Sequence, residues 1–183
     1  MRKGIAFPHI RRQSRVAKPP QQATSMKSRL FRIMRWTVIV GICCLVVSQF
    51  FGPAKTNPST DTSQSIEARL QITPPVAAIL DRSCNDCHSN KTRWPWYSNV
   101  APVSWFVINH VDEGRENLNF SEWGRYTQRD VDGLLKQICR EVKTGAMPLT
   151  SYTPLHPRSR LSKEDVKTLC DWTTAEHLRV TSP

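Results

Sequence analysis

The residues best able to do chemistry in this chain are the run Cys84-Asn85-Asp86-Cys87-His88. The pattern C-x-x-C-H is the one to which a c-type haem is attached covalently. Two thiols at this spacing can form thioethers with the two vinyl groups of one porphyrin, and the following histidine can ligate the iron. A bare C-x-x-C also occurs in zinc sites and redox dithiols, and the added histidine makes the pattern more specific. The sequence therefore predicts covalently attached haem c, with Cys84 and Cys87 binding the porphyrin and His88 binding the iron.

A second iron ligand would have to come from elsewhere, and Met147 is the first candidate. It is the only methionine after residue 54, and it lies in the loop Gly145–Leu149. A thioether sulfur stabilises Fe(II) and raises the reduction potential. The alternative ligand is His110, which would give two imidazoles and a lower potential. A methionine filling a gap in the core, or a hydrogen-bonded core histidine, are the structural alternatives.

The positive charge of the chain lies in its N-terminal part. The formal net charge of the 183 residues is +11, but residues 1–35 hold ten Lys or Arg and no acidic residue. Residues 52–183 hold sixteen basic and all fifteen acidic residues, and are therefore nearly neutral. Because a nucleic-acid-binding domain carries its basic surface on the folded part, we do not expect nucleic acid as a partner.

An apolar segment follows the basic residues. Residues 36–54 contain no charged side chain, and as a helix they would span about 28 Å at ~1.5 Å per residue, close to the ~30 Å hydrocarbon layer of a bilayer. Basic residues before such a segment favour a cytoplasmic N-terminus. We expect a single-pass anchor in a bacterial inner membrane, with the C-terminal domain in the periplasm. A cleaved signal peptide is the alternative.

Two of the six cysteines, Cys139 and Cys170, lie outside both the apolar segment and the C-x-x-C-H motif. Cys43 and Cys44 lie in the apolar segment and are expected to be small apolar residues. An exported domain is in an oxidising compartment, where disulfides persist. We expect Cys139 and Cys170 to bridge two helices, with two free buried thiols as the alternative.

The rest of the chain predicts an all-α fold. Apolar residues recur at helical spacing, with capping residues at the expected ends, and no stretch alternates as a strand does. Long loops around residues 89–100 and 146–161 suit a small, cytochrome c-like helical domain wrapped around a haem. The expected helices are Val76–Arg82, a segment from Ala101-Pro102 to about Leu118, one capped by Thr127 and ended by Gly145, and one capped by Ser162.

Aromatic residues concentrate soon after the motif, in Trp94-Pro95-Trp96-Tyr97 and Trp105-Phe106. We expect these rings to pack on the porphyrin edge, with an indole N–H or Arg93 reaching a propionate. Ordinary core packing is the alternative.

The expected organisation has four parts. Residues 1–35 form a basic, disordered cytoplasmic segment, and residues 36–54 form the transmembrane anchor. Residues 55–72 form a linker, because their polar first part cannot bury much surface. Residues 73–183 form the haem-binding domain.

Several short motifs between Cys84 and about Trp172 can be compared with known families. They are Cys84–Asn90, Trp94–Ser98, Ala101–Trp105, His110–Val111, Glu113–Arg115, Leu118–Ser121, Met147–Leu149 and Leu155–Pro157. In these motifs the chain resembles a bacterial haem-binding domain family of cytochrome c type. The resemblance implies a c-type haem and a membrane-tethered or periplasmic location, and implies no particular reaction. Because both His110 and Met147 match, it leaves the sixth ligand open.

These observations together predict a one-electron carrier. An iron held by His88 and Met147 has no open position for a substrate, which favours electron transfer to an unidentified redox protein near the membrane over catalysis. One alternative is a haem-based sensor or small-ligand binder in which Met147 is displaced. Another is a peroxidase-type haem enzyme with an open distal side.

Overall fold

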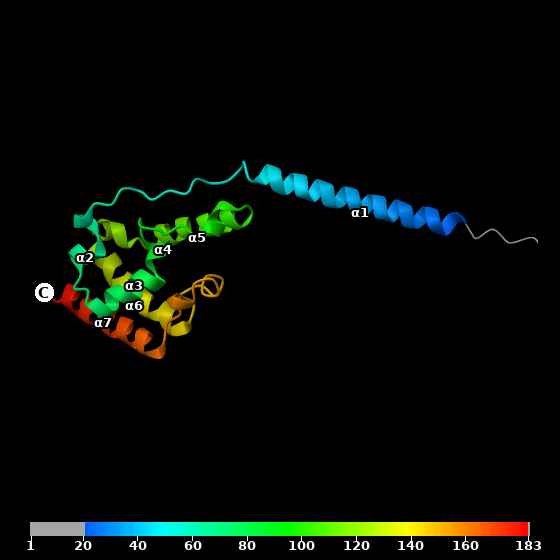
Figure 1. Ribbon diagram of the computed structural model, residues 1–183. Helices are drawn as coiled ribbons and strands as arrows, with labels where there is room; N and C mark the ends of the chain where they lie inside the picture. Colours follow the sequence, from blue (N-terminus) through cyan, green and yellow to red (C-terminus); the bar gives the residue numbers. More distant parts are fainter. Residues whose placement is uncertain (1–20, 183) are drawn as a thin grey trace, which may run out of the picture. The chain divides into compact units, whose positions relative to one another are not determined.

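The structure is a computed structural model that describes residues 21–182, and these residues form helices and loops without any strand (Figure 1). The all-α prediction is therefore confirmed. The chain divides after Val47 into an N-terminal unit and a helical domain that begins at Ser48. The expected disorder of residues 1–20 lies outside the described residues.

The described part of the N-terminal unit consists of the helix α1, Gln21–Ser48, whose last residue belongs to the helical domain. Residues 21–35 were expected to be disordered and are helical instead, because no Gly or Pro interrupts the chain between Gln21 and Val40. Its part Met26–Ser48 is long and apolar enough to cross a membrane, by length and composition. The helix ends before residue 54, where the expected span ended, since Gly52 and Pro53 follow and disfavour helix.

The helical domain contains the four predicted helices and several short ones (Figure 1). Its α-helices are α2, Ile66–Arg69; α3, Pro74–Ser83; α4, Asn85–His88; α5, Val103–Asn117; α6, Gln128–Thr144; and α7, Lys163–Thr181. Four 3₁₀ turns join them: η1, Thr62–Gln64; η2, Trp96–Asn99; η3, Phe120–Arg125; and η4, Pro157–Ser159.

Local sequence signals set the ends of the two longest helices of the domain. Thr127 accepts a hydrogen bond from the Asp130 backbone, whose side chain accepts one in return, so a capping box starts α6. Gly145, at φ 73°, ends the same helix in the left-handed conformation that glycine adopts without strain. Ser162 and Asp165 form a second capping box at the start of α7.

The core lies where α6 and α7 pack along each other. Leu135 of α6 and Leu169 of α7 are fully buried there. Cys139 and Cys170 form a disulfide between these helices, as predicted. The amphipathic stripe of α6 places Val131, Leu135, Ile138 and Val142 in this core.

The core also includes residues upstream of residue 73. Ile66 of α2 and Leu70 directly after it are buried in the same cluster. The Trp172 indole N–H donates to the carbonyl of Gln71 at 2.9 Å. The segment that the sequence presents as polar therefore ends in an apolar turn that packs against α7.

α5 buries only part of the set that recurs at helical spacing in its sequence, Val103, Phe106, Val107, His110 and Val111. Its buried residues are Ser104, Ile108, Val111 and Arg115, whereas Val103 and Phe106 are 45% and 53% exposed. The inner side of the helix therefore also carries polar residues, and Arg115 makes buried polar contacts there, which are described below.

Replacing both Cys139 and Cys170 with Ser removes the only cross-link between α6 and α7 that the described residues form. We expect the free energy of unfolding of the domain to fall by about 2–4 kcal/mol, since a disulfide restricts the unfolded chain. Chemical denaturation of the full chain in detergent, followed by circular dichroism, measures this loss. The control Cys43→Ala/Cys44→Ala removes two thiols from α1 and should leave unfolding of the domain unchanged. An equal loss of unfolding free energy in both variants would contradict the Cys139–Cys170 disulfide.

Candidate functional site

A cavity of about 430 Å³ lies between α4, α5, α6 and the loop that follows α6. This volume lies within the range of about 300–1,000 Å³ that small-molecule and cofactor sites occupy. The cavity is lined by Cys84, Cys87, His88 and Met147, the four residues predicted as site residues, and also by His110. Cys84 and Met147, which are 63 positions apart in the chain, thus line one cavity.

The turn of helix α4 gathers the three residues of the motif. The backbone N–H groups of Cys87 and His88 both donate to the carbonyl of Cys84, at 3.1 and 3.0 Å. Positions three and four residues apart lie on one face of a helical turn, so both thiols and the imidazole border the same space. Neither thiol is in a disulfide.

The imidazole of His88 is held by two backbone carbonyls of α5 and its end. Its Nδ1 lies 2.9 Å from the carbonyl oxygen of Gly114 and 3.0 Å from that of Leu118. Carbonyl oxygens only accept, so Nδ1 carries the proton and the neutral ring leaves the Nε2 lone pair available. Burial lowers the pKa of His88, with the two backbone hydrogen bonds opposing that shift. Metal-ligating histidines are oriented by such a hydrogen bond from their other nitrogen.

The two thiols of the motif are kept protonated. Burial, together with the nearby Cys87 thiol, raises the pKa of Cys84 to about 12. Burial and the charge of Asp86 raise the pKa of Cys87 to about 11. Catalytic dithiols have lowered thiol pKa values instead, so a redox-active dithiol does not fit.

A zinc site does not fit the described residues either. Structural zinc is bound by four Cys, His or carboxylate ligands. Within residues 21–182, no group of three His, Cys, Asp or Glu side chains is arranged to hold a metal ion. The motif instead presents two thiols and one imidazole beside a large cavity. This suits a cofactor that already contains a metal ion bound by most of its ligands.

α4 and α5 approach each other closely at Gly114. A Cβ atom built on Gly114 would lie 2.6 Å from the carbonyl oxygen of Cys87, a distance that side chains do not adopt. The missing side chain therefore lets the carbonyl of Gly114 reach His88. This glycine belongs to the motif Glu113–Arg115, but nothing in its sequence context indicates the contact.

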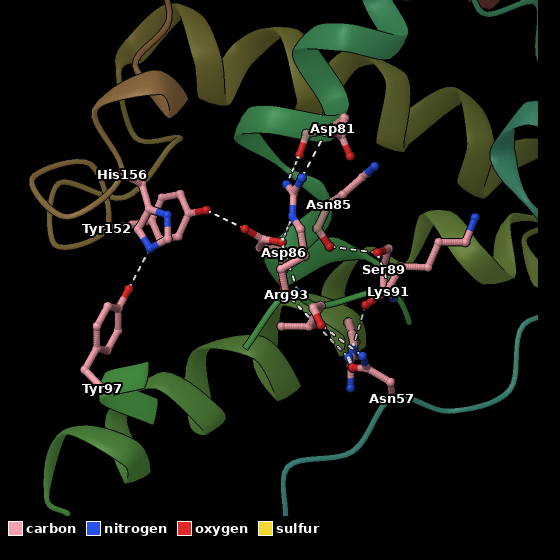
Figure 2. A network of polar contacts seen from close by, with 12 residues as sticks. Asn57, Asp81, Asn85, Asp86, Ser89, Lys91, Arg93, Tyr97, Tyr152 and His156 are labelled. Carbon is pink, nitrogen blue, oxygen red and sulfur yellow. Dashed lines mark hydrogen bonds and ion pairs between the residues drawn. The ribbon is translucent and has the colours of Figure 1, made fainter. Parts of the chain in front are cut away.

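Asp86, inside the motif, ties α4 to both long loops (Figure 2). Its Oδ1 accepts from the Arg93 backbone N–H and from Nε, at 3.2 and 3.0 Å. Its Oδ2 accepts from the hydroxyl of Tyr152 at 2.7 Å. The Tyr152 ring stacks on His156 at 4.0 Å, and His156 Nε2 is hydrogen-bonded to the Tyr97 hydroxyl at 2.6 Å. The loop that carries Met147 is thereby attached to the C-x-x-C-H motif.

Arg115 holds the other side of the motif. This side chain is buried, and its guanidinium donates to the carbonyls of Ser89 and Thr56 at 2.9 and 2.8 Å. It also donates to the side chains of Asn57 and Thr92. Desolvation lowers the pKa of Arg115. Because its donors are satisfied by oxygens from two segments, it fixes the chain directly after His88.

Both candidate second ligands border the cavity. Met147 follows the end of α6, where its backbone N–H donates to the carbonyl of Glu141 at 3.1 Å. His110 lies on α5, and its Nδ1 lies 2.8 Å from the carbonyl oxygen of Phe106. As in His88, this leaves Nε2 as the nitrogen with a free lone pair in the neutral ring.

The aromatic rings that line the cavity are Phe120 and Tyr152. Of the aromatic run after the motif, Trp96 is 78% exposed, while Tyr97 and Phe106 line a smaller neighbouring cavity of about 130 Å³. Packing of this run on a porphyrin edge stays a prediction.

Arg93 is bound by two carboxylates: its guanidinium pairs with Asp81 at 3.1 Å and with Asp86 at 3.0 Å. A contact of Arg93 with a propionate stays a prediction. Tyr152 and Phe120 were missed because each reaches the site through a contact distant in sequence, which no local pattern encodes.

The comparisons with known proteins agree with this geometry. A family model described as a haem-binding domain matches residues 43–175. Neither the curated proteins nor the solved structures contain a significant match to the chain.

Replacing Gly114 with Ala should lower the free energy of unfolding by about 1–3 kcal/mol, the usual cost of overpacking, because α5 must move away from α4. The matched control is Gly133→Ala on α6, where an added Cβ meets no atom within 4 Å. It should be neutral or stabilise by up to about 1 kcal/mol, as alanine favours helix. Denaturant titration of the full chain compares the two, and equal stability in both would refute the close contact.

Proposed function

Because the chain belongs to this haem-binding domain family, we propose that it is a c-type haem protein that carries single electrons. The observation that supports it best is the placement of His88 beside two thiols on one cavity, with Nδ1 hydrogen-bonded and Nε2 available. This is the arrangement that an iron-binding imidazole requires.

Cys84 and Cys87 are the residues that would hold the porphyrin. Each thiol would add its S–H across one vinyl group to form a thioether, a reaction that needs no leaving group. When bound, the haem supplies one Fe(III)/Fe(II) couple. The protein's part is to orient His88 through the carbonyls of Gly114 and Leu118, and to exclude water from the cavity with apolar residues of α6.

Met147 is the proposed second ligand. Its loop is attached to α4 through the hydrogen bond between Tyr152 and Asp86, which would help to hold the Met147 side chain at the cavity. A neutral sulfur donor would favour Fe(II) and a high potential. If both His88 and Met147 bound the iron, electron transfer to a redox protein partner would be favoured over chemistry on a substrate.

The proposed location is the periplasmic side of a bacterial inner membrane. α1 has the length and composition of a membrane span, and the ten basic residues before residue 36 favour a cytoplasmic N-terminus. The disulfide between Cys139 and Cys170 supports an oxidising compartment for the domain.

A haem-based sensor or small-ligand binder is the second candidate function. It is favoured by the smaller cavity, which shares His110 and Tyr152 with the main one and so extends the space beside the site. In a sensor, a ligand such as carbon monoxide would displace Met147 from the iron. In a peroxidase-type enzyme, no protein residue would bind the iron on that side.

The double variant Cys84→Ala/Cys87→Ala should lose covalent haem entirely, because no thiol remains to form a thioether. Mass spectrometry of the denatured full chain, expressed in a bacterium that matures c-type cytochromes, measures the added porphyrin. Cys43→Ala/Cys44→Ala is the matched control and should keep it. A parent protein without added porphyrin mass would refute the proposal.

Replacing Met147 with Ala should lower the reduction potential by a substantial part of the ~0.8 V range that axial ligands span. It should also let carbon monoxide bind the reduced protein rapidly. His110→Ala is the comparison variant and should leave both properties unchanged. If His110→Ala lowers the potential and admits carbon monoxide while Met147→Ala does neither, His110 is the ligand. Rapid carbon monoxide binding by the parent protein would favour the sensor or the enzyme.

A further inference from the structure

The large exposed apolar side chains of the helical domain are concentrated on one part of it. Of nine such residues among those the structure describes there, only Leu178 lies on α7. We call the remaining eight the apolar face: Phe50, Phe51, Trp96, Val100, Val103, Trp105, Phe106 and Leu155. Large exposed apolar patches mark sites that bind a protein or a membrane.

Contacts within the domain join the parts of this face. The indole N–H of Trp105 donates to the carbonyl of Phe51 at 2.8 Å. Ala101 exchanges two hydrogen bonds with the side chain of Gln49, its N–H donating at 3.0 Å and its carbonyl accepting at 3.3 Å. η2 packs against α5, and Val103, Phe106 and Leu155 line the same small cavity. The face is therefore one surface built from three segments.

The chain itself indicates what covers the face. Gln49 and Phe51 come one and three residues after Ser48, where the span-length helix α1 ends. Three residues reach at most about 11 Å. Gln49, whose side chain bonds to Ala101, and Phe51, whose carbonyl accepts from Trp105, therefore lie within this chain length of the end of α1, and any bilayer holding α1 is close to the start of α5.

The composition of the face suits a bilayer interface. Residues 94–111 contain no Asp, Glu, Lys or Arg, and neither do residues 36–54. Tryptophan is favoured at the boundary of lipid and water, where its ring is apolar and its N–H finds a polar partner. Trp96 and Trp105 both lie on the face.

We infer that the apolar face rests in the lipid headgroup region of the bilayer that holds the domain's own anchor. The inference rests on the proposed membrane anchoring through α1, and is independent of haem attachment. It makes the face a second, peripheral membrane contact that restricts the orientation of the domain, in addition to the covalent tether.

Photolabelling of the full chain tests this contact. The chain is reconstituted in vesicles of phosphatidylcholine that carries a diazirine near the glycerol end of one acyl chain. Trypsin cleavage after Lys and Arg separates residues 36–55, 94–115 and 168–179, and mass spectrometry counts lipid adducts on each peptide. We expect adducts on residues 36–55 and 94–115, and none above background on residues 168–179, which contain Leu178.

A double variant adds a second measurement. Trp96→Glu/Phe106→Glu should lower labelling of residues 94–115 by about tenfold, because carboxylates resist transfer from water into an apolar layer. Leu178→Glu, which alters an equally exposed apolar side chain outside the face, should leave the labelling unchanged. Labelling that is the same in both variants would overturn the inference.

The labelling pattern also separates the two proposals. Adducts on residues 36–55 without adducts on residues 94–115 would retain the anchor and overturn the inference, since the face would then be covered by protein or left in water. An absence of adducts on residues 36–55 would refute the anchor, and the inference with it.

Discussion

The site depends on the close crossing of α4 and α5 at Gly114. The backbone of α5 can approach the carbonyl of Cys87 because no side chain intervenes. The same approach brings the carbonyl of Gly114, with that of Leu118, to His88 Nδ1. One steric condition therefore sets the position of the motif, the tautomer of the imidazole and the boundary of the cavity.

Polar contacts extend this arrangement to the loops. Asp86 holds Arg93 and Tyr152 on one side of α4, and Arg115 holds the chain after His88 on the other. Asp86 and Arg115 are both largely buried, with exposed fractions of 13% and 8%. Hydrogen bonds to such charged groups contribute more to stability than hydrogen bonds between neutral groups. α6, cross-linked to α7 by the disulfide, supplies the apolar wall through Leu134, Ile138 and Val142. The loops around the site are thus positioned by charge, and the wall by apolar packing.

Local patterns were sufficient for much of the fold. The caps at Thr127 and Ser162 and the stop at Gly145 are encoded within one helical turn, and the structure has all three. Cys84, Cys87, His88, Met147 and His110 were found from residue type and spacing, and all five border one cavity.

Features that depend on contacts distant in sequence were not predictable. The buried face of α5 includes Arg115, whose partners lie as far away as Thr56, so the apolar spacing of the helix predicted its buried side only in part. The bond between Tyr152 and Asp86 joins residues 66 positions apart. Ile66 and Leu70 lie beside a polar segment and enter the core through contacts distant in sequence, since α2 packs against η3.

The disulfide has a consequence for how such a protein matures. Four cysteines lie in the helical domain, but Cys139 and Cys170 are separated by 31 residues and Cys84 and Cys87 by one helical turn. In the unfolded chain the nearer pair meets more often, since short loops close at lower entropic cost. A bond between those two sulfurs would block the proposed thioethers. The proposed haem attachment therefore requires Cys84 and Cys87 to stay reduced until haem binds, while Cys139 and Cys170 are oxidised as α6 and α7 meet.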